Sequence, residues 1–215
     1  MKIEVWSDVV CPWCYVGSRN LAAAMRSFSH ADEVEVEWRS YELDPRAPAE
    51  RSGSYVERIS RKYGIPVGQA RASMSRIIQV GADAGIDFRF DDARLGNTFD
   101  AHRLIHLARS HGRQEELKDR LFAAAFSEGR PIGDHETLVE LAVEAGLPEG
   151  DARRVLSSDE HADDVRADEA DAIEVGVDGV PFFLIDRRFM IPGAQAPETV
   201  LAILERAWRK TTHVD

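Results

Sequence analysis

The 215-residue chain has 38 acidic and 27 basic residues, a formal net charge of −11, and 44% hydrophobic residues. This size and apolar content are sufficient for a substantial buried core. The negative charge argues against binding of a nucleic-acid backbone, which requires a basic face. No apolar run approaches the roughly 18 residues that cross a bilayer, so no membrane segment is expected.

The N-terminal residues and the cysteine content both favour a cytoplasmic location. Glu4 and Asp8 interrupt the segment that would have to form the apolar part of a signal peptide. Cys11 and Cys14 are the only cysteines, and two cysteines in a reducing compartment do not form a structural disulfide framework. We therefore expect them to be catalytic, redox-sensing or metal-binding.

The first 43 residues have the pattern of strand, helix, strand. Alternating apolar residues predict strands at 3–7 and 34–43, and helical spacing predicts a helix at 15–28 between them. Pro45 and Pro48 follow the second strand and stop it from continuing. This order predicts a right-handed parallel βαβ unit.

The middle of the chain is helical almost throughout. Helical periodicity and glycine or proline breaks predict helices at roughly 53–63, 66–84, 97–111, 114–128, 135–145 and 150–157. Asp134 is the expected N-cap of the fifth of these helices, and Asn97 or Thr98 that of the third. Strand patterns are missing here, which predicts an all-helical domain at 49–157 inserted into a split domain formed by 1–48 and 158–215.

The remaining elements complete that split domain. An acidic helix is expected at 159–175, with its charges on a solvated outer face and Val165, Ala172 and Ile173 on its apolar side. Apolar runs at 180–185 and 189–191 predict a buried hairpin, and a last helix is expected at 197–208. The predicted class is α/β, in the thioredoxin order β-α-β … α-β-β-α with the inserted helices.

Cys11, Pro12, Trp13 and Cys14 form a C-x-x-C motif at the turn from the first strand to the first helix. At such a turn, the positive end of the helix dipole stabilises a thiolate on the first cysteine. Cys11 is thus the predicted nucleophile and Cys14 the resolving thiol. A structural zinc site would need four ligands, and no histidine lies near the motif in sequence. Trp13 is expected to be exposed between the two sulfurs and to contact the substrate.

Four segments carry a resemblance to a known family: 7–14 (SDVVCPWC), 97–104 (NTFDAHRL), 179–183 (GVPFF) and 193–195 (GAQ). Together they resemble the DsbA-like thioredoxin superfamily, especially its FrnE-type cytoplasmic branch. The resemblance implies dithiol–disulfide oxidoreductase or isomerase activity. It also implies that Pro181 is a cis-proline facing the C-x-x-C motif, and that the backbone of Val180 is free to pair with an extended substrate.

Two further parts of the matching segments are candidates for the rim of the active site. Inserted domains of this family cover the active site, so Asn97 and His102 are expected to line the cleft above Cys11, the alternative being helix packing or a surface position. Gln195 is a candidate for the same rim. His102 and His106 have the spacing of a zinc-binding pair, but Arg103 stands where that motif has its glutamate, which argues against a metal.

A related branch leaves a second function open. The 2-hydroxychromene-2-carboxylate isomerases and kappa-class glutathione transferases share the fold, but they typically have serine at the position of Cys11 and use bound glutathione. We therefore expect a disulfide-containing protein or a small thiol as substrate, no permanently bound cofactor and no metal, with glutathione open as redox partner. The alternatives are a glutathione-dependent isomerase or transferase acting on a small aromatic or electrophilic compound, and a peptide-binding holdase with redox-sensing cysteines. Oligomeric state and the direction of electron flow stay open.

Overall fold

The computed structural model describes residues 1–212, within which four strands form one mixed sheet in the order β2-β1-β3-β4. The inner strand β1 pairs in parallel with β2 and antiparallel with β3, and β3 forms a hairpin with β4. The predicted βαβ unit and hairpin are confirmed. The second strand stops three residues before its predicted end, and the third begins at the residue after Pro181. The strands are β1 (Lys2–Ser7), β2 (Glu35–Ser40), β3 (Phe182–Ile185) and β4 (Phe189–Pro192).

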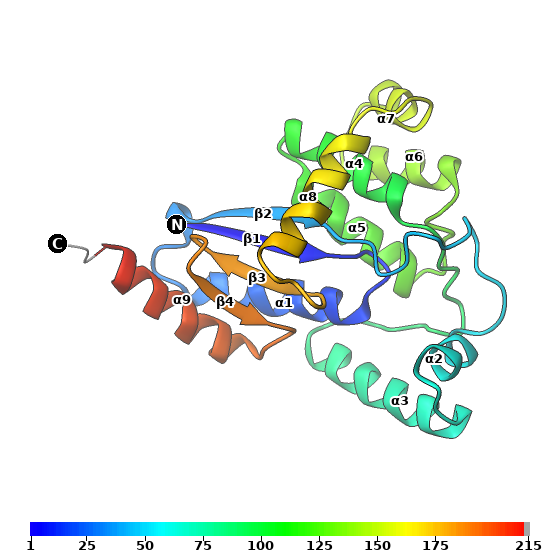
Figure 1. The fold of residues 1–215 in the computed structure, drawn as a ribbon, viewed down its shortest axis with the longest axis horizontal. Helices are drawn as coiled ribbons and strands as arrows, with labels where there is room; N and C mark the ends of the chain where they lie inside the picture. Colours follow the sequence, from blue (N-terminus) through cyan, green and yellow to red (C-terminus); the bar gives the residue numbers. More distant parts are fainter. Residues whose placement is uncertain (213–215) are drawn as a thin grey trace.

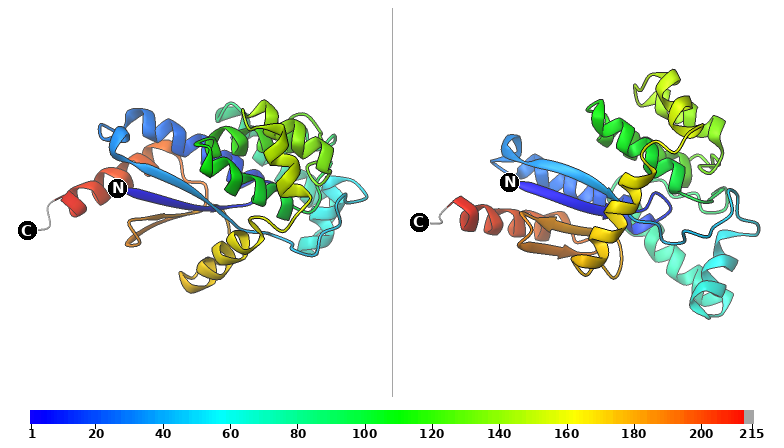
Figure 2. Two further views of the ribbon diagram at one scale, coloured as in Figure 1. Left: turned by 90° about the horizontal axis from the view of Figure 1, so that it is seen from above. Right: turned by 45° about the horizontal axis from the view of Figure 1, so that its top comes forward.

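Helices cover both faces of the sheet (Figures 1 and 2). Helices α1 (Pro12–Ser27) and α9 (Pro197–Thr212) lie on one face, and α8 (Ala162–Glu174) lies on the other. Side chains alternate along a strand, so β1 places Ile3 and Val5 in the main core under α1 and directs Trp6 into a smaller cluster beside α8. The sheet is therefore buried on both sides.

Between β2 and α8 the chain forms the helical block that the periodicity predicts. Its hydrophobic core is continuous with that of the sheet; for example, the rings of Tyr15 on α1 and Phe122 on α5 stack with centroids 5.0 Å apart. Asp134 is the N-cap of α6, as predicted, and accepts from the Thr137 N–H. The block contains α2 (Tyr55–Tyr63), α3 (Val67–Asp83), α4 (Phe99–Ser110), α5 (Gln114–Phe126), α6 (His135–Glu144) and α7 (Glu149–Leu156); a short 3-10 turn, Ala31–Glu33, precedes β2.

The segment that links β2 to α2 passes through a narrow crossing. A Cβ atom added at Gly96 would lie 1.7 Å from the carbonyl oxygen of Ala49, and one added at Gly133 would lie 2.0 Å from it. The Asn97 N–H donates to Pro48 O at 2.9 Å, which fixes the segment against the loop before α4. The linking segment is therefore packed between two loops, and the residue closest to it in each loop is a glycine.

Helix α8 differs from the prediction for the acidic segment. It begins at Ala162, after Asp159 and Glu160, and Ile173 is 80% exposed instead of facing inward. Asp168, expected on a solvated face, is only 2% exposed and points at the sheet. None of the helices within residues 1–212 is long and apolar enough to cross a membrane.

Candidate active site

The loop after β1 places Cys11 at the start of α1. Cys11 is the N-cap residue, and its carbonyl oxygen accepts from the N–H groups of Cys14 and Tyr15 at 3.0 and 3.3 Å. The helix begins at Pro12, three residues earlier than the apolar periodicity predicts. Proline suits this position because a first-turn N–H has no partner within the helix. The thiol of Cys11 therefore lies at the positive end of the α1 dipole.

Cys14 lies one turn further along α1 and is completely buried, whereas Cys11 is 5% exposed. Both cysteines are free thiols. Burial raises the pKa of Cys14 well above its ordinary value, and the adjacent Cys11 raises it further; hydrogen bonds from the Ser7 hydroxyl and the Asp8 N–H oppose this only in part. Cys11 is therefore the outer of the two thiols, and Cys14 is held protonated behind it.

The loop before β3 completes the surroundings of the sulfur. The Val180–Pro181 peptide bond is cis, and the Cys11 thiol donates to the carbonyl oxygen of Val180, with 3.6 Å between Sγ and O. Gly17 on α1 makes this approach possible, because a Cβ atom there would lie 2.9 Å from Pro181 Cγ and 3.2 Å from Phe183 Cζ. Residues from opposite ends of the chain therefore meet at the first thiol.

The other residues singled out from the sequence lie in three different settings. Trp13 is 41% exposed, next to Cys11. The side-chain amide of Gln195 donates to Pro192 O at 2.8 Å, and the backbone carbonyl of Gln195 accepts from the Asn20 side chain, so Gln195 shapes the turn between β4 and α9. Asn97 accepts from the Phe99 N–H at 2.9 Å and so satisfies the start of α4, although Thr98 holds the N-cap position. Substrate contact by Gln195 and Asn97 stays a prediction.

His102 lies beneath the motif loop and not at an open surface. Its Nε2 is 3.5 Å from Asp8 Oδ1, and both side chains are buried. The other oxygen of Asp8 accepts from the Leu43 N–H at 2.7 Å. Burial raises the pKa of the neighbouring Glu42 carboxyl, and the hydrogen bond from Arg166 opposes this only in part. His102 Nε2 and Glu42 Oε1 are both buried without a hydrogen-bond partner among the described residues.

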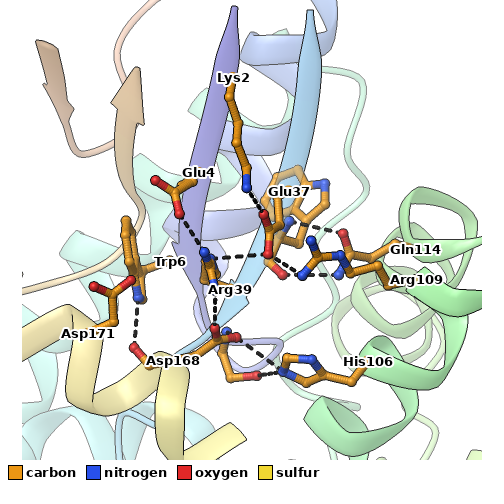
Figure 3. Close-up of polar contacts among 12 residues, drawn as sticks. Lys2, Glu4, Trp6, Glu37, Arg39, His106, Arg109, Gln114, Asp168 and Asp171 are labelled. Carbon is orange, nitrogen blue, oxygen red and sulfur yellow. Dashed lines mark hydrogen bonds and ion pairs between the residues drawn. The ribbon is translucent and has the colours of Figure 1, made fainter. Parts of the chain in front are cut away.

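A second buried polar cluster lies further along the sheet (Figure 3). Arg39 on β2 lies between Glu4 and Asp168, at 2.5 and 2.7 Å, and also contacts Glu37. His106 Nε2 is 3.1 Å from Asp168. His102 and His106, which have the spacing of a zinc-binding pair, therefore have different partners. Within residues 1–212, no group of three or more His, Cys, Asp and Glu side chains is arranged to hold a metal ion. This cluster joins α8 and α4 to the sheet.

Sequence reasoning did not identify Tyr55 as a neighbour of the dithiol. Burial raises its pKa, and the nearby Cys11 raises it further. Ser54 caps α2 directly before it in a complete capping box with Glu57. The capping box was visible in the sequence as Ser and Glu three residues apart, but nothing local indicated that the following tyrosine would come within electrostatic range of Cys11.

The chain is similar to known proteins over nearly its whole length. A family model, the DSBA-like thioredoxin domain, matches residues 2–205. The crystal structure of SCO1869 from Streptomyces coelicolor, a probable DsbA oxidoreductase, is 41% identical, covers 100% of this chain and 93% of its own, and has a TM-score of 0.94. YwbO of Bacillus subtilis is 30% identical over 196 residues, which is 90% of each chain.

A more distant similarity shows the shared fold alone. 2-Hydroxychromene-2-carboxylate isomerase is 15% identical with a TM-score of 0.70, and the match covers 100% of both chains. The family model, by contrast, spans nearly the whole chain, including both cysteines and Pro181. The chain therefore belongs to the DsbA-like thioredoxin family.

Proposed function

We propose that the protein is a cytoplasmic thiol–disulfide oxidoreductase or isomerase of the FrnE-type branch, in which Cys11 attacks and Cys14 resolves. The observation that carries this proposal is the arrangement of the two sulfurs. One lies at a helix N-terminus beside the Val180 carbonyl, and the other is fully buried one turn behind it. In this proposal the outer thiol attacks first, and the buried, protonated thiol then resolves the mixed disulfide.

The exchange begins when the Cys11 thiolate attacks one sulfur of a substrate disulfide. A Cys11–substrate disulfide forms, and the other substrate sulfur leaves as a thiolate that takes up a proton. The Cys14 thiol then loses its proton and attacks Cys11 Sγ, which releases the second substrate thiol and leaves a Cys11–Cys14 disulfide. Two electrons pass to the substrate. Two thiols of a reductant, such as glutathione, then supply two electrons to the protein. They reduce the Cys11–Cys14 disulfide through a mixed disulfide at Cys11 and form the disulfide of the reductant.

Surrounding residues have separate roles in this proposal. The backbone of Val180, next to Pro181, pairs with an extended substrate as an added strand would. The exposed ring of Trp13 contacts the apolar part of the substrate. Asp8 and His102 lie behind the motif and position the loop that leads to Cys11, next to the Cys14 thiol that must release a proton. The cytoplasm is the compartment in which both thiols are kept reduced.

Glutathione is the reductant that the relatives support. DsbM of Pseudomonas aeruginosa, a cytosolic disulfide reductase, has been solved with glutathione; it is 19% identical to this chain, with a TM-score of 0.66. Because this likeness shows the fold alone, the use of glutathione here is our proposal. The proposed exchange requires no permanently bound cofactor.

The proposal is tested with single-cysteine variants and a scrambled disulfide-bonded protein in a glutathione buffer. Cys11→Ser should abolish exchange, and Cys14→Ser should accumulate a mixed disulfide at Cys11 that mass spectrometry detects after acid quenching. Exchange that survives Cys11→Ser would overturn the assignment. Glutathione-dependent turnover of a small electrophile that survives Cys14→Ser would favour the isomerase or transferase. Suppression of client aggregation by the double serine variant, without exchange in the wild type, would favour a holdase.

A further inference from the structure

A shallow basic pocket lies on the helical block. Its volume is about 310 Å³, and it is lined by Pro48, Arg51, Ser52, Arg58 and Arg61. The arginines come from the segment before α2 and from α2 itself. The chain as a whole has a net charge of −11. An anionic molecule is therefore repelled by the average surface and attracted at this position.

Arg58 is the arginine of the pocket with an unsatisfied donor. Its Nη1 donates to Gly53 O at 2.6 Å, whereas its Nη2 is buried and has no hydrogen-bond partner among the residues that the structure describes. Burial lowers the pKa of Arg58, and the charges of Arg51 and Arg61 lower it further. A buried charged donor without a partner is unfavourable. An anion that drew the Arg58 side chain toward the pocket and accepted from this nitrogen would remove the penalty.

The acidic residues nearby leave most of this charge uncompensated. Asp44 pairs with Arg51, with 2.6 Å between Oδ2 and Nη2. Glu57 Oε2 accepts from the Ser54 N–H in the capping box. Among residues 1–212, neither Arg58 nor Arg61 has a carboxylate within ion-pair distance, so the pocket keeps an excess of positive charge.

One aromatic ring, that of Tyr55, lies against Arg58 of the pocket and is close enough to Cys11 for the two side chains to interact electrostatically. The guanidinium carbon of Arg58 is 5.5 Å from the centroid of the Tyr55 ring, which itself stacks on Phe90 at 4.7 Å. The Tyr55 hydroxyl is the group whose pKa Cys11 raises. In Figure 1, α2 and α3 lie beside the N-terminal end of α1, and α3 contacts α1 directly. The pocket therefore belongs to the helices that lie beside the end of α1 that carries Cys11.

We propose that Arg58, supported by Arg51 and Arg61, forms a carboxylate-binding subsite that selects disulfide substrates with a negative charge close to the reacting half-cystine. A guanidinium group presents paired N–H donors that match the two oxygens of a carboxylate. The subsite rests on the proposed function, because it deepens that function by naming the class of substrate.

The test uses pairs of disulfides in which one member has a carboxylate and the other has a carboxamide at the same position. One pair is the symmetric disulfide of acetyl-Cys-Gly-Glu-amide and its glutamine analogue, which tests a side-chain carboxylate. The other is the disulfide of acetyl-Cys-Gly with a free or an amidated C-terminus, which tests a terminal carboxylate. The rate constant for oxidation of the reduced protein is followed by tryptophan fluorescence. The acid-to-amide ratio in each pair measures the selectivity and identifies which source of carboxylate is bound.

We expect a ratio of about ten in at least one pair, as for one charge-assisted hydrogen bond. It should fall to about one in Arg58→Gln and to an intermediate value in Arg61→Gln, whose exposed side chain makes a folding defect minor. Arg26→Gln, the same change in charge at the far end of α1, is the matched control and should keep the wild-type ratio. A wild-type ratio of one in both pairs, or a ratio unchanged in Arg58→Gln, would overturn the subsite.

A second readout does not depend on thiol chemistry. Equilibrium binding of acetyl-Ser-Gly-Glu-amide and acetyl-Ser-Gly, which contain no sulfur, is measured calorimetrically with wild type and Arg58→Gln. Binding that is lost in Arg58→Gln supports the subsite even if no disulfide exchange is found, in which case only the proposed function fails. Exchange without carboxylate-dependent binding or selectivity leaves the function in place and refutes the subsite.

Discussion

His102 Nε2 on α4 lies 3.5 Å from Asp8 Oδ1 on the loop that leads to Cys11, and both side chains are buried. The backbone of the same aspartate donates to Cys14 and accepts from the Cys11 N–H. The helical block therefore does more than cover the dithiol from outside: one of its histidines reaches behind the motif. The conformation of the motif loop depends on the packing of α4 against the sheet.

Replacing His102 should separate its positioning role from simple packing. We expect His102→Leu to lose about 1–3 kcal/mol of unfolding free energy, because the buried Asp8 carboxylate loses a polar neighbour. Its exchange rate should also fall, and the pH profile of exchange should change shape. His102→Gln keeps an N–H donor and should recover most of both properties. Urea denaturation and exchange assays between about pH 5 and 9 make the comparison; equal profiles for wild type and His102→Leu would refute the role.

The protonated state of Cys14 predicts a strong pH dependence of the resolving step. Burial keeps its pKa high even after Cys11 enters a mixed disulfide, when the contribution of the Cys11 thiol is lost. Below that pKa the thiolate fraction rises about tenfold per pH unit. The release of glutathione from glutathionylated Cys11 should therefore accelerate by roughly this factor per unit across neutral pH, as followed by acid-quench mass spectrometry. A rate independent of pH would show that another group takes the proton in advance.

The close approach of α1 to Pro181 makes Gly17 a sensitive position. In Gly17→Ala the new methyl group meets the Pro181 ring and Phe183, and overpacking of this kind costs about 1–3 kcal/mol. The higher helix propensity of alanine offsets up to about 1 kcal/mol of that loss. We expect a small loss of stability and a several-fold slower exchange, because the Val180 carbonyl shifts relative to Cys11. Gly68→Ala on α3, where the added Cβ meets nothing within 4 Å, is the control and should leave exchange unchanged.

Asp168 predicts how stability depends on acid. Burial alone would raise its pKa, but hydrogen bonds from His106, the Ser40 N–H and Arg39 outweigh burial and lower it below its ordinary value of 3.8. The folded state thus binds fewer protons than the unfolded state as the pH falls. The stabilisation is complete above the ordinary pKa and is lost as the pH falls below it.

Asp168→Asn should therefore be about 3–5 kcal/mol less stable near neutral pH, because Arg39 loses a buried partner. Its unfolding free energy should also vary less with pH below about 5 than that of the wild type. Guanidinium denaturation at a series of pH values measures both effects. Glu174→Gln, an exposed change on the same helix, should stay within about 0.5 kcal/mol; a similar loss in both variants would contradict the explanation.

The fold was largely predictable because each element has a strong local pattern. Strand alternation in 3–7 and the helical periods of the inserted block depend on neighbours a few positions away, and burial on one face preserves them. Element ends were less predictable. Helix α1 starts at Pro12 because an N-cap cysteine and a first-turn proline extend it beyond the apolar pattern. Helix α8 starts late because His161, with a φ of 63°, breaks the helical backbone before it.

The site divides in the same way. Cys11 and Cys14 were predictable because the whole motif is local, and Pro181 only through the resemblance to a family. Asp168 was assigned to a solvated face because an acidic helix normally faces water, yet its partners Arg39 and His106 come from a strand and a helix distant in sequence. Arg58 was likewise invisible, since an arginine on a short polar helix gives no sign of an unpaired, buried nitrogen. Such pairings exist only after tertiary packing.

The crossing at Ala49 limits how this protein can vary. Its carbonyl oxygen occupies the space of a side chain at both Gly96 and Gly133, so alanine at either position requires the backbone itself to move. Loops usually tolerate replacement and insertion well, but here three loop segments fix one another. Substitutions along the exposed surfaces of α2 and α3 should therefore disturb this fold less than grafting a different helical block at this junction.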